Sequence, residues 1–272
     1  MIYFILGCYM VPIEPNSDEW ICIINTETRP DTWGGLSMIY VTGDTHAEVS
    51  RFTHMREYGL TKDDYLIVAG DFGCIFGLGW KDEYKLDELE EQPFTTLFID
   101  GNHECFPKIY SYPEEIWNGG RIHRIRSNIL HLMRGQVFTI EDQSIFTMGG
   151  GYSIDIAFRI PGRSWWPEEM PSEEEYAEAL ENLKKHGNKV DVIISHAAPD
   201  ETMQLFVQTG IISNRLPQEM KLNCFLENVR QTVDHKHYYF GHMHLDKKLW
   251  RNQTALYYDV YCLNTGEQIT AQ

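Results

Sequence analysis

Short apolar runs alternate with amphipathic segments along residues 38–272 of the chain. The amphipathic segments predict helices over residues 47–58, 81–92, 173–186 and 218–233. The apolar runs are too short for helices and predict strands. Because strands and helices alternate, the pattern is typical of a layered α/β domain. The predicted strands cover residues 38–42, 65–69, 96–99, 129–133, 137–140, 144–148, 190–194, 237–240 and 255–260.

The predicted helix over residues 173–186 has the clearest ends. Ser172 stands at its N-cap position, and Glu175 follows three residues later, which is the spacing of a capping box. Gly187 follows the last helical residue and predicts the end of the helix there.

Residues 1–37 differ from the rest, since prolines and glycines divide them and neither helical nor strand periodicity persists. We treat residues 1–37 as an N-terminal extension whose role the sequence does not define, and residues 38–272 as one domain. Two interpretations stay open. In the first, Met38 is the start of translation and residues 1–37 are an upstream addition. In the second, the segment packs a strand on the edge of the domain.

Composition and charge exclude several classes of protein. A hydrophobic content of 43% in 272 residues supplies a full core, which excludes a disordered chain. The net charge of −17 argues against a partner such as long duplex DNA or an anionic membrane, although a small phosphate on a local cation stays compatible. Six cysteines without a C-x-x-C pair indicate a reducing compartment, so we expect a cytoplasmic protein. The apolar run 2–11 is about half of the ~20 residues that a membrane span needs.

Five predicted strands end in polar residues of the kind that bind ligands, usually after a glycine. Ligands collect beyond the carboxyl ends of strands in α/β sheets, so we expect one site built from residues far apart in the sequence. The five strand ends are Gly43-Asp44-Thr45-His46, Gly70-Asp71, Asp100-Gly101-Asn102-His103-Glu104, Ser195-His196 and Gly241-His242-Met243-His244.

The residue types at these strand ends point to metal ions. Carboxylate, imidazole and amide oxygen suit divalent ions such as manganese, our first choice, or iron, zinc and cobalt. One ion takes about four to six ligands, so seven candidates are more than one ion needs. Two divalent ions that share one carboxylate would use them all. The seven candidates are Asp44, His46, Asp71, Asn102, His196, His242 and His244.

The five strand ends resemble, in the same order, the five motif blocks of the calcineurin-like metallophosphoesterases. The resemblance spans residues 38–244 and implies a four-layer α/β/β/α sandwich with two mixed β-sheets. It also implies that Asp71 bridges the two ions and that His103 lies beside them without binding. It assigns Asp44, His46 and His244 to one ion, and Asn102, His196 and His242 to the other.

One position departs from the family pattern. Several family members, notably the Ser/Thr protein phosphatases, carry an Asp three residues after the bridging Asp, where it pairs with the acid histidine, and an Arg follows. Here Cys74 stands at that position and no Arg follows. The partner of His103 is therefore missing or supplied elsewhere, which speaks against a protein phosphatase.

The charges of such a site predict a mechanism. A water held between two divalent ions becomes a hydroxide near neutral pH and attacks phosphorus in line. Protonated His103 then donates to the departing oxygen, and Asn102 offers an amide N–H to the phosphate. Asp100 and Glu104 are candidates for orienting these groups.

The loop over residues 160–168 adds candidates for substrate contact. Arg163 is a candidate phosphate clamp, and Trp165 or Trp166 could stack on a base. Alternatively, the tryptophans fix the loop to the core.

We expect a small phosphorylated or nucleotide-type substrate, a phosphomonoester or a phosphodiester. One alternative is a catalytically silent scaffold with this fold, which would be expected to lose His103 or several ligands. Another is a nuclease on short single strands, which would need the two tryptophans to stack bases. The sequence does not define the oligomeric state.

Overall fold

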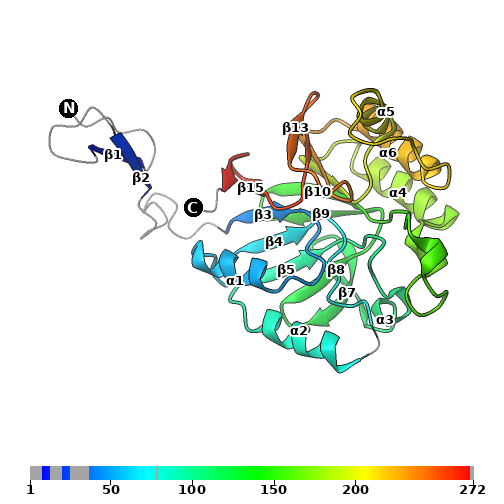
Figure 1. Ribbon diagram of the computed structural model, residues 1–272, viewed down its shortest axis with the longest axis horizontal. Coiled ribbons are helices and arrows are strands. Elements are labelled where there is room, and N and C mark those ends of the chain that lie inside the picture. The colour runs from blue at the N-terminus through cyan, green and yellow to red at the C-terminus, as the bar shows by residue number, and fades with distance from the viewer. Residues whose placement is uncertain (1–7, 13–19, 25–36, 78, 270–272) are drawn as a thin grey trace.

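The structure is a computed structural model that describes residues 8–12, 20–24, 37–77 and 79–269 (Figure 1). Most of its strands form two mixed sheets. The larger sheet has parallel strands at its centre and antiparallel strands at both edges. In spatial order its strands are β16 (Gln268–Ile269), β15 (Val260–Cys262), β3 (Ile39–Thr42), β4 (Tyr65–Val68), β5 (Thr95–Phe98), β8 (Ile129–Leu132), β7 (Gly120–Arg126) and β6 (Glu114–Trp117).

The second sheet is also mixed, with an antiparallel strand at each edge. Its strand order is β13 (Lys247–Leu249), β14 (Gln253–Ala255), β12 (His237–Phe240), β11 (Val192–Ser195), β10 (Gln143–Met148) and β9 (Gln136–Ile140).

The two sheets pack face to face because their central strands are apolar on both sides. In β3, Ile39 and Val41 belong to the apolar cluster between the sheets, whereas Tyr40 belongs to the cluster under the helices. Alternate residues of a strand point to opposite faces, so one short apolar run contributes to two cores. This explains why the runs are apolar throughout instead of alternating with polar residues.

Helices cover the outer faces of both sheets, on opposite sides of the molecule in Figure 1. The larger sheet carries α1 (Ser50–Glu57), α2 (Trp80–Glu90) and α3 (Phe106–Ile109). The smaller sheet carries α4 (Glu173–Lys185), α5 (Asp200–Gln208) and α6 (Met220–Thr232). The layers therefore run α/β/β/α, which confirms the predicted four-layer sandwich.

The sequence pattern predicted the positions of most helices and strands correctly. Every predicted strand from 38–42 to 237–240 overlaps an observed strand, and each predicted helix overlaps α1, α2, α4 or α6. The capping box at Ser172 and Glu175 is present. The helices α3 and α5 and the strands β6, β7, β13 and β16 were not predicted.

The predicted strand over residues 255–260 is wrong. The chain instead leaves the smaller sheet after β14 and enters the larger one at β15. The Asp246 carboxylate causes the turn, because it accepts the N–H groups of Tyr257, Tyr258 and Asp259 at 2.7, 2.9 and 2.9 Å. Those N–H groups are then not available to a sheet.

The N-terminal segment contains two strands, β1 (Cys8–Pro12) and β2 (Trp20–Ile24), although the sequence predicted no regular element there. They pair antiparallel with each other and, within the described part of the chain, with no strand of the larger sheets. The rest of residues 1–36 lies outside the described residues, so the division at residue 38 stays a prediction. No helix in the described ranges has the length and apolar character that crossing a bilayer requires.

Candidate metal centre

The carboxyl ends of five strands, three from the larger sheet and two from the smaller, bring the predicted ligands to one edge of the sandwich. His46 follows β3 and His244 follows β12, yet their Nε2 atoms lie 2.9 Å apart. Side chains from opposite ends of the domain therefore meet, as the strand-end pattern predicted.

A first group of four possible ligands surrounds this pair of histidines. One ligand atom from each of Asp44, His46, Asp71 and His244 lies within 4.8 Å of all the others. The His244 Nε2 atom is 3.2 Å from Asp44 Oδ2, and the His46 Nε2 atom is 3.8 Å from Asp71 Oδ2. Two carboxylates and two imidazoles in this space form a donor set for a divalent cation.

A second group shares Asp71 with the first. Ligand atoms of Asp71, His196 and His242 also lie within 4.8 Å of one another. The His196 Nε2 atom is 3.5 Å from Asp71 Oδ1 and 3.2 Å from the side-chain oxygen of Asn102. Asp71 thus directs Oδ2 toward one group and Oδ1 toward the other, and the donor chemistry of both groups fits a metal ion.

The glycines at the strand ends are explained by close approach of the ligands. A Cβ atom on Gly70 would lie 2.1 Å from His196 Nδ1, and one on Gly101 would lie 2.1 Å from Asp71 Oδ1. Real Cβ atoms do not come this close to other atoms, so any other residue would displace a ligand.

Several of the predicted ligand residues adopt a left-handed backbone conformation, which is uncommon outside glycine. Such strain gathers at functional sites, where the surrounding structure holds it in place. These residues and their φ angles are His46 at 45°, Asp71 at 47°, His242 at 65° and His244 at 47°.

The sequence model of the calcineurin-like phosphoesterases matches residues 37–246, which include all five strand ends. The chain belongs to the calcineurin-like phosphoesterase family. Members of this family are generally metal-dependent phosphoesterases, in agreement with the two donor groups. No curated protein matches the chain.

Hydrogen bonds orient the predicted ligand residues. The His196 Nδ1 atom lies 3.0 Å from the backbone oxygen of Ala69, so Nδ1–H donates a hydrogen bond to that oxygen. The lone pair of Nε2 then stays available for a metal ion. Burial by itself would raise the pKa of Asp71, but the surrounding histidines, His196 first, lower it. Asp71 is therefore a carboxylate at neutral pH.

Asp100 and Glu104, which sequence reasoning suggested as orienting residues, are both fully buried. Burial, with Asp71 nearby, raises the pKa of Glu104 well above its usual range, and its Oε1 atom accepts the Phe72 N–H at 2.8 Å. Asp100 contacts residues outside the two donor groups. Its carboxylate accepts from Arg134 at 2.6 Å, and its backbone oxygen accepts the Gly150 N–H.

The structure adds Glu219, which sequence reasoning missed. Its buried Oε1 atom lies 3.0 Å from His242 Nε2 and accepts the Tyr152 N–H at 2.9 Å. Burial would lower the pKa of His242, but the Glu219 carboxylate outweighs it and raises that pKa to about 9. Glu219 lies in the first turn of the predicted helix 218–233, where acidic residues are common. The sequence therefore gave no indication that Glu219 contacts His242.

His103 lies beside the two groups, with its ring centre 4.9 Å from that of His46. Its backbone N–H donates to Asp71 Oδ1 at 2.8 Å, and its Nε2 atom lies 3.0 Å from Arg159 Nη2. Because a guanidinium only donates, Nε2 accepts and the ring is neutral. Burial lowers the pKa of His103, Asp71 opposes this, and Arg159 lowers the pKa further.

Arg159 is therefore the residue that contacts His103, for which the sequence identified no partner. Cys74, at the position of the family's Asp, is buried, and burial raises the pKa of its thiol, so it stays protonated. Arg159 comes from the irregular segment before the tryptophans and is held by Asp155 at 2.6 Å.

The structure places Arg163, the candidate phosphate clamp, on the surface of the protein. Arg163 is exposed, and its backbone N–H closes a turn onto Ile160. Arg159, not Arg163, lines the cavity of about 650 Å³ at the metal centre, together with Asp71, Asn102 and His242.

One of the two tryptophans of the loop, Trp166, is fixed to the core, which was the alternative to stacking on a base. Trp166 is 4% exposed, belongs to the core under the helices, and packs edge-on against Phe76. Trp165 is half-buried. A buried ring cannot stack on a base, so Trp166 fixes the loop to the core.

Proposed function

We propose that the chain is a phosphoesterase that uses two divalent metal ions to hydrolyse a small phosphomonoester or a nucleotide-type phosphodiester. The observation that carries this proposal is the position of Asp71, whose two oxygens face two separate donor groups. In this proposal Asp44, His46 and His244 hold one ion with Asp71, and Asn102, His196 and His242 hold the other.

The donor set of carboxylates, imidazoles and one amide oxygen supports manganese, with iron, zinc or cobalt as alternatives. When bound, two such ions lower the pKa of water and offset the negative charge of phosphate oxygens.

Arg159 and Asn102 are the groups that this chain offers to the substrate phosphate. Both line the 650 Å³ cavity with Asp71. The Arg159 guanidinium is a planar donor that suits phosphate oxygens. The Asn102 amide N–H donates to Ser153 Oγ at 3.2 Å, which fixes the amide so that its oxygen faces His196.

His103 is the proposed proton donor to the leaving oxygen. In the free chain its Nε2 atom accepts a hydrogen bond from Arg159. A phosphate oxygen between the two side chains takes that N–H, and its negative charge favours a proton on Nε2. Nε2 then holds the proton beside the bond that breaks, which is the position that general-acid catalysis requires.

The retention of His103 and of every proposed ligand supports an enzyme over a silent scaffold. The burial of Trp166 speaks against a nuclease that stacks bases on this loop.

The test is hydrolysis of p-nitrophenyl phosphate and its bis-ester by the purified chain with Mn²⁺. We expect His103→Gln to lower kcat by about 100-fold or more, since general-acid catalysis contributes that much. Asp71→Asn should abolish turnover and lower the metal content of the protein. His186→Gln, at an exposed histidine, is the matched control. Wild-type turnover no higher than that of Asp71→Asn with manganese, iron, zinc and cobalt would identify a scaffold instead.

A further inference from the structure

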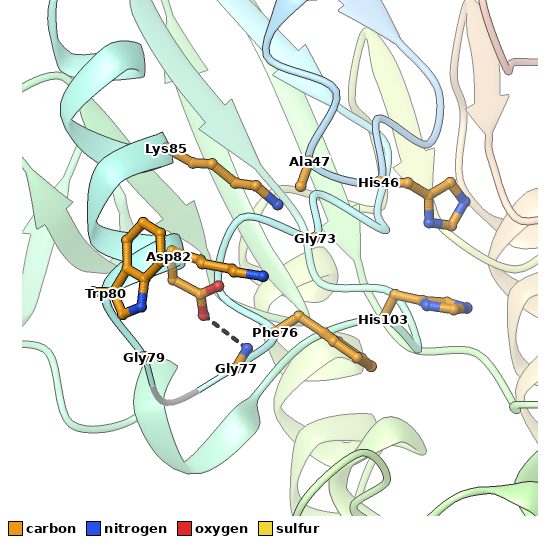
Figure 2. Close-up of a pocket in the computed structure, with 11 residues that line it drawn as sticks. His46, Ala47, Gly73, Phe76, Gly77, Gly79, Trp80, Asp82, Lys85 and His103 are labelled. Atoms are coloured by element: carbon orange, nitrogen blue, oxygen red, sulfur yellow. Dashed lines mark hydrogen bonds between the residues drawn. The ribbon is translucent and has the colours of Figure 1, made fainter.

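A second cavity, of about 480 Å³, adjoins the metal centre (Figure 2). His46 and His103 form one side of it. The loop after β4 contributes Phe76, which lies against the His103 ring, and the first turns of α2 contribute Trp80, Lys81 and Lys85. The role proposed above for the metal centre does not use this space.

The charge in this cavity is unbalanced. Lys85 is half-buried, and Figure 2 shows its side chain extending from α2 toward His46 and Ala47. Among the described residues, its amine has no hydrogen bond and no carboxylate within 4.0 Å, and its charge acts on Asp82 only through space. A half-buried ammonium without an ion pair favours an anion beside it.

Asp82 is the acid that lines the cavity, and its carboxylate is already engaged. Its Oδ2 atom accepts the Gly77 N–H at 2.7 Å, which ties it to the loop after β4. Lys81 lines the cavity as well and is exposed. Two lysines against one engaged carboxylate make this a positive cavity in a chain of net charge −17.

The cavity lies where a leaving group would extend. His103, the proposed proton donor, lines both cavities, and Phe76 stacks on its ring at 5.7 Å. In the proposed function the leaving oxygen is next to His103, so the space in front of Lys85 is within reach of a long leaving group that passes this ring.

We infer that this cavity binds a second phosphate carried by the leaving group, so that the substrate is a nucleotide-type phosphoester with at least two phosphates. The inference rests on the proposed function and adds the substrate class. In the reaction, the oxygen of water adds to phosphorus and the P–O ester bond breaks. The leaving oxygen takes a proton, which gives inorganic phosphate and an alcohol that keeps the second phosphate.

The experiment compares three substrates with the Mn²⁺-loaded protein. Adenosine 3′,5′-bisphosphate carries the second phosphate, whereas 3′-AMP and p-nitrophenyl phosphate do not. We expect Lys85→Met to raise KM for the bisphosphate about tenfold, the effect of one charged hydrogen bond, with kcat little changed. KM for the other two substrates should change less than about twofold, because they place no charge beside Lys85. Lys62→Met removes an exposed lysine outside both cavities and should change none of the three.

An equal change for all three substrates, or an unchanged KM for the bisphosphate, would overturn the inference while leaving the proposed function intact. Failure of the proposed function looks different, since the wild type would then hydrolyse none of the three. Calorimetric binding of the bisphosphate to wild type and to Lys85→Met then decides the question, because the inferred site predicts about tenfold weaker binding to the variant.

Discussion

The Nε2 atoms of His46 and His244 lie 2.9 Å apart, although the two histidines are 198 positions apart in the chain. Asp44 and Asp71 flank the pair, at 3.2 Å from His244 and 3.8 Å from His46. The side chains of all four residues converge on one point. A divalent cation at that point would contact two imidazoles and two carboxylates at once, so it would bind the folded chain and not the unfolded one.

Manganese should therefore raise the melting temperature, and His244→Ala should reduce that rise. A ligand at 100 times its Kd stabilises the folded state by about 2.7 kcal/mol. The His244 side chain is 49% exposed, so its removal leaves the metal-free fold almost unchanged. Thermal unfolding with Mn²⁺ and with a chelator measures both values. A full manganese effect in the variant would contradict the first ligand group.

Glu219→Gln should weaken metal binding without removing a ligand. The Glu219 carboxylate lies 3.0 Å from His242 Nε2 and thereby fixes the ring. Residues that orient a metal ligand in this way change affinity by about 10- to 100-fold. Titration calorimetry with Mn²⁺ measures the loss, with Glu201→Gln as the control at a partly exposed acid. Equal affinity in wild type and Glu219→Gln would show that His242 needs no such support.

Arg159→Gln should reduce kcat/KM, whereas Arg163→Gln should not. The Arg159 side chain is 8% exposed and adjoins His103, while Arg163 is exposed on the same loop. Loss of a charged hydrogen bond to phosphate costs about 1.5–3 kcal/mol, or about 10- to 100-fold in kcat/KM. Steady-state kinetics with p-nitrophenyl phosphate measures both variants. The reverse order of effects would restore Arg163 as the phosphate clamp.

The convergence of the strand-end residues could be predicted because their signal is local. An apolar run, a glycine and a polar residue stand together in the sequence at Gly70 and Asp71, and the fold class places such ends at one edge. Glycine is needed there since a Cβ on Gly70 would meet His196, a contact with a residue more than a hundred positions away. The sequence pattern therefore records a tertiary constraint that is visible without the structure.

Arg159 and Glu219 could not be predicted because nothing local distinguishes them. Arg159 follows a short 3-10 turn, and Glu219 precedes α6, so each looks like an ordinary surface charge. Their roles depend on how the segments pack across the carboxyl ends of the strands. The strand predicted over residues 255–260 failed for a similar reason, since the carboxylate that turns the chain there belongs to Asp246.

A pair of buried histidines on the neighbouring strands β7 and β8 of the larger sheet offers a test of the fold that is independent of metal. His123 is 1% exposed, and its Nδ1 atom lies 3.0 Å from that of His131, with the two rings stacked. Burial, followed by the neighbouring His131, lowers the pKa of His123 from its usual 6.5 to about 4. The folded chain therefore keeps this ring neutral at pH values where the unfolded chain protonates it.

The contribution of His123 to the free energy of unfolding should therefore fall as the pH decreases from 7 to 5. Between those values the unfolded chain binds more protons at His123 than the folded chain does, so acid favours unfolding. The contribution of this one group is about 2 kcal/mol. His123→Phe keeps a ring against His131 but cannot take up a proton, so its stability should decrease by about 2 kcal/mol less than that of the wild type. Urea unfolding of the metal-free chain at pH 7 and pH 5 measures the difference, with His186→Gln, at an exposed histidine, as the control. Parallel pH profiles for wild type and His123→Phe would mean that His123 is accessible to protons in the folded chain.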